Sequence, residues 1–200
     1  MEIRINDQLP FFISVTVVLT IFYAIYFIKK IEQKRKGIQT RQIGSRKEKT
    51  AHTIEILMSA ATLCIVPIQL FSAVVGFSCL PAGARFTGLL IGLLGDGIFL
   101  VSVICMKDSW RAGIPDKDKT ELVTSGIYKY SRNPAFLAFD LQYVGVLLLY
   151  CNVISAAFTV FAVVMLHLQI LQEEKYLEKT FGEEYLNYKK KTFRYLGRKK

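Results

Sequence analysis

Charged side chains are missing from most of the long apolar stretches of this 200-residue sequence, and its cysteines are few and isolated. The four cysteines form no CxxC pair, which argues against a structural zinc site and against a disulfide framework. No internal repeat is visible. Five blocks hold at most one charged residue each: residues 11–28, 56–80, 86–106, 134–150 and 153–172.

Each of these blocks is long enough to cross a bilayer, which needs about 20 apolar helical residues. A large soluble helical bundle would need polar helix faces, which the blocks lack. Hydrophobic residues make up 52% of the chain. The sequence therefore predicts an all-α, multi-pass membrane protein with about five transmembrane helices.

The basic residues predict how the chain is oriented. Of 26 Lys and Arg, nine lie in residues 29–49, six in 107–132 and nine in 175–200, whereas Arg4 and Arg85 lie elsewhere. Because basic loops stay in the cytoplasm, we expect the N-terminus outside and the C-terminus inside. The net charge of +10 then reflects topology and contact with anionic lipid of the bilayer, and nucleic acid is a poor candidate partner.

Two polar segments should meet at the cytoplasmic face. Residues 107–133 precede the fourth block, and a tail from Glu173 follows the fifth. The two blocks are separated by a very short turn, so we expect an antiparallel helical hairpin that brings both segments together. Within the third block, Gly88 and Gly92 indicate close helix packing, since the preceding strand of a nucleotide-binding loop is missing.

The stretch GIYKYSRNPAF, residues 126–136, has the features of a binding site. Asn133 is a favourable N-cap and Pro134 suits the first helical position. The free N–H groups of such a helix start attract anions, and Arg132 adds a positive charge. The aromatic residues Tyr128 and Phe136 offer flat faces, although an interfacial aromatic belt and a snorkelling Arg132 remain the simpler interpretation of each residue singly.

Glu173 and Glu174 lie where the fifth block ends. Carboxylates at that depth are costly unless they meet cations. A ligand that carries both an ammonium and a carboxylate would satisfy both polar segments. An internal salt bridge, for example between Glu173 and Arg132, would do so equally well.

Three stretches together resemble the isoprenylcysteine carboxyl methyltransferase family, which belongs with the membrane phospholipid methyltransferases. They are SWRAGI (109–114), TELVTSGIYKYSRNPAF (120–136) and EEKYLEKTFGEEYLNYKKKTFRYLG (173–197). The similarity covers roughly the second half of the chain. It implies a membrane methyltransferase core over residues 107–200, preceded by helices within residues 1–106 and the basic loop 29–51.

The resemblance also implies S-adenosylmethionine as cofactor and a lipophilic or membrane-borne acceptor. By position, Arg132 and Glu173 would serve catalysis, and Gln169 and Asp140 would face the acceptor. The cofactor contacts carried over by position are Thr120, Glu121, Leu122, Val123, Tyr128, Asn133, Pro134, Ala135, Phe136 and Glu173. A phospholipid amine N-methyltransferase and a non-catalytic membrane scaffold of the same fold stay open as alternatives.

The chain departs from the family pattern at three positions. Asn133 replaces a frequent His, and Ala138 replaces a common Gly. Gln169 stands where the prenylcysteine enzymes have an Arg that meets the substrate, which weakens the case for a prenylcysteine carboxylate. Two interpretations of Asp140, a contact with the acceptor and a role in helix packing, are equally supported by the sequence. For His167 we expect a role in packing.

Overall fold

A computed structural model describes residues 5–40, 42–43, 48–111 and 121–199 of the chain. Helices dominate, and the part described contains no β-strand. The elements are α1 (Ile5–Arg35), α2 (Lys49–Val75), α3 (Ala82–Met106), η1 (Lys107–Ser109), η2 (Gly126–Lys129), α4 (Pro134–Leu149), α5 (Val153–Phe181) and α6 (Glu183–Lys191).

The predicted all-α, multi-pass membrane architecture is confirmed, with one difference in length. Helices α1, α2, α3 and α5 are long and apolar enough to cross a membrane, whereas α4 is a shorter apolar helix of 16 residues. The chain leaves helical geometry at Tyr150, where φ is −136° and ψ is 71°. The first part of the basic segment 29–51 is helical, because α1 continues to Arg35.

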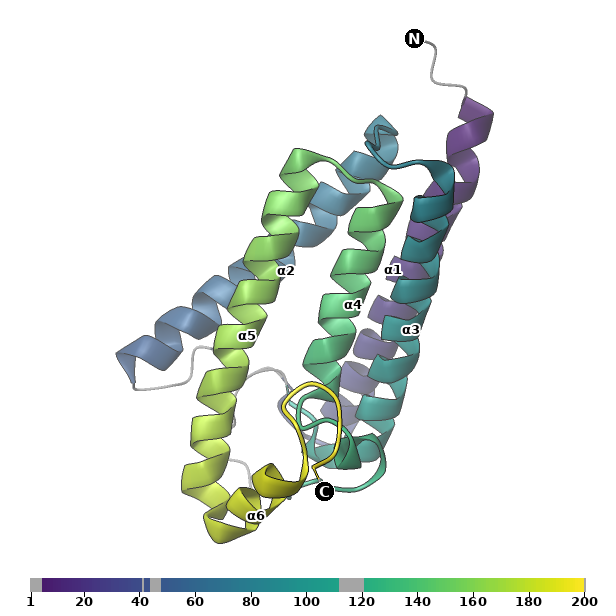
Figure 1. Cartoon of the computed structure of the whole chain (residues 1–200). Coiled ribbons are helices and arrows are strands. Elements are labelled where there is room, and N and C mark those ends of the chain that lie inside the picture. Colours follow the sequence, from purple (N-terminus) through teal and green to yellow (C-terminus); the bar gives the residue numbers. More distant parts are fainter. Residues whose placement is uncertain (1–4, 41, 44–47, 112–120, 200) are drawn as a thin grey trace.

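The helices form a bundle in which α4 lies between two pairs of neighbours (Figure 1). Helix α3 packs mainly along α4, and α2 packs mainly along α5. The predicted α4–α5 hairpin is present, with Asn152 as a true N-cap that accepts a hydrogen bond from the Ser155 N–H at 2.9 Å. The short helix α6 lies at the end of the bundle where α4 begins (Figure 1).

Glycines allow α3 to approach its neighbours closely, as the sequence predicted. A Cβ atom added at Gly88 would lie 2.5 Å from the carbonyl oxygen of Gly145 on α4. One added at Gly92 would lie 2.9 Å from a methyl carbon of Val18 on α1. Small residues of this kind let membrane helices come into backbone contact.

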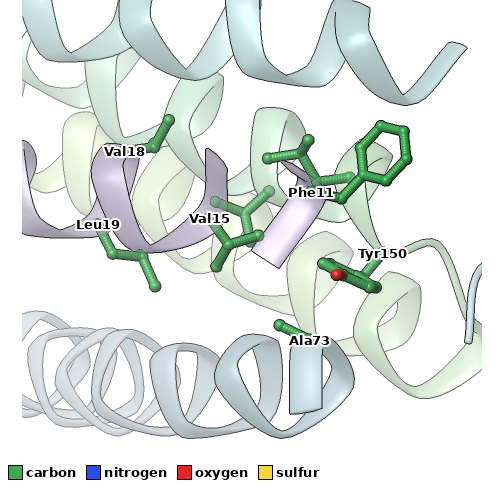
Figure 2. Close-up of a cluster of buried hydrophobic side chains, with 8 residues drawn as sticks. Phe11, Val15, Val18, Leu19, Ala73 and Tyr150 are labelled. Carbon is green, nitrogen blue, oxygen red and sulfur yellow. The ribbon is translucent and has the colours of Figure 1, made fainter. Parts of the chain in front are cut away.

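A cluster of buried apolar side chains joins α1 to α2 and to the end of α4. Phe11, Val15 and Leu19 of α1 pack with Ala73 of α2 and with Tyr150, as Figure 2 shows. This cluster lies at the end of α4 that is remote from Pro134. It leaves the other end of the bundle, where α4 starts, to be shaped by loops and the C-terminal tail.

Candidate functional site

A cavity opens around the first turn of α4, and we call it the loop cavity. Its walls come from the end of α3 and η1, residues 121–123, η2, the end of α5 and α6. It holds about 870 Å³ of space, including the part open to solvent.

Glu174 joins this rim to the C-terminal tail through a buried cluster of charges. Its Oε1 accepts hydrogen bonds from Nη2 of Arg132 at 2.7 Å and from Nδ2 of Asn133 at 3.3 Å. Its Oε2 accepts one from Nη2 of Arg194 at 2.9 Å. The Arg132 and Glu174 side chains are only 6% and 5% exposed, so this carboxylate neutralises a guanidinium that is almost fully buried.

The two polar segments therefore meet, as predicted from the hairpin, but the ion pair is made by Glu174 and not by Glu173. The backbone N–H of Arg132 also donates to the carbonyl oxygen of Phe193 at 3.0 Å. The Tyr188 hydroxyl of α6 donates to the Tyr128 carbonyl oxygen at 2.6 Å. These bonds fix the tail against the loop that leads into α4.

Asn133 occupies the N-cap position of α4, but its side chain makes no capping hydrogen bond. Its Nδ2 instead donates to Glu174 and to the carbonyl oxygen of Arg194. The cap predicted from the sequence is thus correct in position and wrong in its contact. Within the described chain, the first-turn N–H groups of α4 are left without this side-chain acceptor, and they are donors at the wall of the loop cavity.

Burial changes the acidity of the phenols around the loop cavity. It raises the pKa of the Tyr128 hydroxyl well above its usual range, and it does the same for Tyr185 and Tyr188. These three side chains therefore stay protonated at neutral pH. They act as hydrogen-bonding and apolar walls and not as bases.

A second cavity, the helix cavity, lies between α1, α2, α4 and α5. Its lining is mainly apolar and aromatic, including Tyr26, Phe27, Met58 and Phe139, with Lys30 among the polar residues. It holds about 1,150 Å³, again including open space. Five residues line both cavities: Trp110, Arg111, Ala135, Phe136 and Glu173. The two spaces therefore adjoin at the start of α4.

The loop cavity gathers most of the residues that the sequence singled out. Its lining includes Glu121, Leu122, Val123, Tyr128, Arg132, Asn133, Pro134, Ala135, Phe136 and Glu173. Thr120, also predicted to contact the cofactor, lies outside the described residues. The roles of these residues remain predictions.

The two residues predicted to face an acceptor line neither cavity. Gln169 is fully buried and donates from Nε2 to Oε1 of Glu173 at 3.1 Å, so it touches the shared wall through Glu173. Asp140 lies within α4, one turn and a half from its start. His167 pairs with Tyr195, whose hydroxyl lies 2.6 Å from the ring Nδ1, in agreement with a packing role.

The sequence did not single out several residues that build the site. Trp110 is the only tryptophan, is 4% exposed and lines both cavities. Glu174, Tyr185 and Tyr188 were visible as part of the tail motif, yet only Glu173 was assigned a contact. The regular spacing of tyrosines and acidic residues in that motif was the available signal.

Comparison with known proteins agrees with this geometry. A sequence model of the "Isoprenylcysteine carboxyl methyltransferase (ICMT) family" matches residues 88–179. Protein-S-isoprenylcysteine O-methyltransferase of Saccharomyces cerevisiae is 31% identical over 146 residues, which are 70% of this chain and 59% of the yeast protein. The human protein of the same name is 31% identical over 110 residues, 52% of this chain and 38% of its own length.

A rice protein, described as a probable protein-S-isoprenylcysteine O-methyltransferase, is 30% identical over 109 residues. The match covers 53% of this chain and 57% of the rice protein. The chain thus spans about half the length of the curated relatives it matches. The matched segment runs from α3 through the α4–α5 hairpin and includes the shared wall of the two cavities. Over residues 88–179, the chain is similar to the isoprenylcysteine carboxyl methyltransferase family of membrane proteins.

Proposed function

We propose that this protein transfers a methyl group from S-adenosylmethionine, held in the loop cavity, to a lipophilic acceptor held in the helix cavity. The observation that carries the proposal is the shared wall at Ala135, Phe136 and Glu173, since a transfer needs two binding spaces that meet at one point. Such alignment of two reactants is itself a large source of rate acceleration.

The loop cavity has groups that suit each part of the donor. The N–H groups of Ala135 and Phe136, at a helix start, suit a carboxylate. The carboxylates of Glu121 and Glu173 suit an ammonium. The aromatic walls suit an adenine ring, and when bound the donor supplies a methyl group on a cationic sulfur, which is attracted to aromatic faces.

The helix cavity suits an acceptor that arrives through the bilayer. Much of its aromatic and aliphatic lining comes from α1, α2 and α5, which are long and apolar enough to span a membrane. Lys30 and Arg111 are the basic residues of its lining and favour an acceptor with an acidic group. A lipophilic carboxylate such as an S-prenylated cysteine combines both properties, and the relatives named above carry that substrate in their names.

Glu173 is the residue that we expect to matter most at the junction. Gln169 fixes its carboxylate by a hydrogen bond across one helical turn. The carboxylate faces both spaces, so it can hold the donor ammonium while leaving the methyl group directed towards the acceptor. No covalent enzyme intermediate is required for a direct displacement.

The test combines binding and transfer in the full chain, purified in detergent. We expect S-adenosylhomocysteine to bind by calorimetry and labelled methyl to pass from S-adenosylmethionine to an S-farnesylated cysteine. Leu63→Trp, in the lining of the helix cavity, should raise the KM for the acceptor about tenfold, equivalent to about 1.4 kcal/mol. The matched variant Leu70→Trp, which lies on the same helix but outside that lining, should leave it unchanged.

Three outcomes would redirect the proposal. Absence of binding would overturn the donor assignment. Binding followed by labelling of phosphatidylethanolamine vesicles, and not of the prenylated cysteine, would select a phospholipid amine N-methyltransferase. Binding with no transfer to either acceptor or to a membrane extract would select the scaffold alternative.

A further inference from the structure

At the end of the bundle remote from both cavities, two turns are joined by their backbones. Cys79 lies in the turn between α2 and α3, and Cys151 lies in the turn between α4 and α5. The N–H of Cys79 donates to the carbonyl oxygen of Cys151 at 2.9 Å. The N–H of Cys151 donates to Oγ of Ser78 at 3.2 Å. The turns are therefore in register, with one cysteine facing the other.

The two thiols also approach each other. Burial raises the pKa of the Cys151 thiol, and a hydrogen bond with the Cys79 thiol raises it further. Both cysteines are in the reduced state in this structure, and Cys79 is exposed. The backbone hydrogen bond between the two residues and the contact between their thiols bring the side chains together, as a disulfide requires.

We propose that Cys79 and Cys151 form a disulfide that ties the α2–α3 turn to the α4–α5 turn. The pair is separated by many residues in the sequence, so spacing alone does not reveal it. The remaining cysteines differ in place, because Cys64 lies within α2 and Cys105 within α3. Neither the donor nor the acceptor space uses this pair, and the inference is independent of the proposed methyl transfer.

The oxidant required is a disulfide donor, that is, an oxidised dithiol protein or oxidised glutathione. The exposed Cys79, as thiolate, attacks one sulfur of the donor, forms a mixed disulfide and releases one donor thiolate. Cys151 then loses its proton and attacks the Cys79 sulfur, which releases the second donor thiolate. The two protons from the cysteines pass to the donor thiolates, so the donor gains two electrons and leaves as a dithiol or two thiols.

The test counts thiols in the full chain in detergent. In a Cys64→Ser/Cys105→Ser background, a polyethylene glycol maleimide should add twice to the denatured protein before treatment with oxidised glutathione. After treatment it should not add at all, and mass spectrometry should find one peptide pair linked through residues 79 and 151. The wild-type chain provides the same linked pair as a readout should the double substitution disturb folding.

The converse pair is the control. A Cys79→Ser/Cys151→Ser chain, with Cys64 and Cys105 present, should give no linked peptides under the same treatment. The proposal is overturned if the Cys64→Ser/Cys105→Ser protein keeps both labels. It is equally overturned if that protein carries only separate glutathione adducts, because the two sulfurs then cannot reach each other.

Discussion

Replacing Glu174 by Gln should destabilise the protein, although the substitution is nearly isosteric. The change leaves Arg132 buried without its counter-charge, at 6% side-chain exposure, while Arg194 is 34% exposed and can turn to water. Breaking a buried pair by removing one partner costs about 3–5 kcal/mol, and a half-exposed pair contributes about 0–1 kcal/mol. Since the Gln oxygen can still accept one hydrogen bond, we expect the lower part of that range, about 3 kcal/mol.

Thermal unfolding in detergent measures this effect. For a chain of this size, about 3 kcal/mol corresponds to a fall in Tm of about 6–12 °C. The tail should also become a better trypsin substrate at Arg194, because the guanidinium of Arg194 no longer pairs with Glu174. Its carbonyl oxygen then keeps the long hydrogen bonds from the Asn133 amide at 3.3 Å and the Ser131 hydroxyl at 3.4 Å.

Glu173→Gln is the matched control. It changes the adjacent carboxylate, whose Oε1 accepts from Gln169 and which faces both cavities. We expect its Tm to stay close to that of the wild type while S-adenosylhomocysteine binding is lost. An unchanged Tm for Glu174→Gln, or equal destabilisation by the two variants, would refute the assignment of the buried charge cluster to Glu174.

Two further predictions concern the helix bundle. Gly145→Ala should lower the free energy of unfolding by about 1–3 kcal/mol, because its Cβ would lie 2.6 Å from the backbone nitrogen of Gly92. Gly97→Ala is the control and should be neutral or stabilising, because a Cβ there meets nothing within 4 Å. A larger loss of stability for Gly97→Ala than for Gly145→Ala would contradict the packing. Arg85→Lys should reduce the free energy of unfolding by about 1–3 kcal/mol and lower Tm accordingly. The reason is that Nε of Arg85 donates to the Leu149 carbonyl oxygen at 2.7 Å, and a lysine cannot keep that geometry. An unchanged Tm would show that this hydrogen bond is dispensable.

The helices could be predicted because absence of charge over about 20 residues is a property of composition, independent of packing. The predicted block 134–150 matches α4 to within one residue for the same reason. The contact that holds the turn after α4 could not be predicted, because the Cys79 N–H donates to the Cys151 carbonyl oxygen and these residues are remote in the sequence. The glycine positions were informative because a missing Cβ has the same steric meaning in any helix pair.

The candidate site was predictable in its location and less so in its contacts. A short α4–α5 hairpin brings residues 107–133 and the tail together, whichever side chains these segments carry. The choice between Glu173 and Glu174 as partner of Arg132 was not open to sequence reasoning. Neighbours on a helix point about 100° apart, and which of them faces Arg132 depends on how the tail folds back. The Asn133 side chain donates to Glu174 and to the Arg194 carbonyl oxygen of this tail, and therefore makes no capping hydrogen bond.

The shortness of α4 sets the depth at which everything around its first turn lies. At 1.5 Å per residue its 16 residues extend about 24 Å, less than the roughly 30 Å of a hydrocarbon core, whereas the 29 residues of α5 extend about 43 Å. We infer that α4 alone does not reach both headgroup layers, and that the loop, the tail and α6 continue the bundle beyond its first turn. In the proposed methyl transfer, a charged donor from water and a lipophilic acceptor from the bilayer would then meet at the same depth beside this turn.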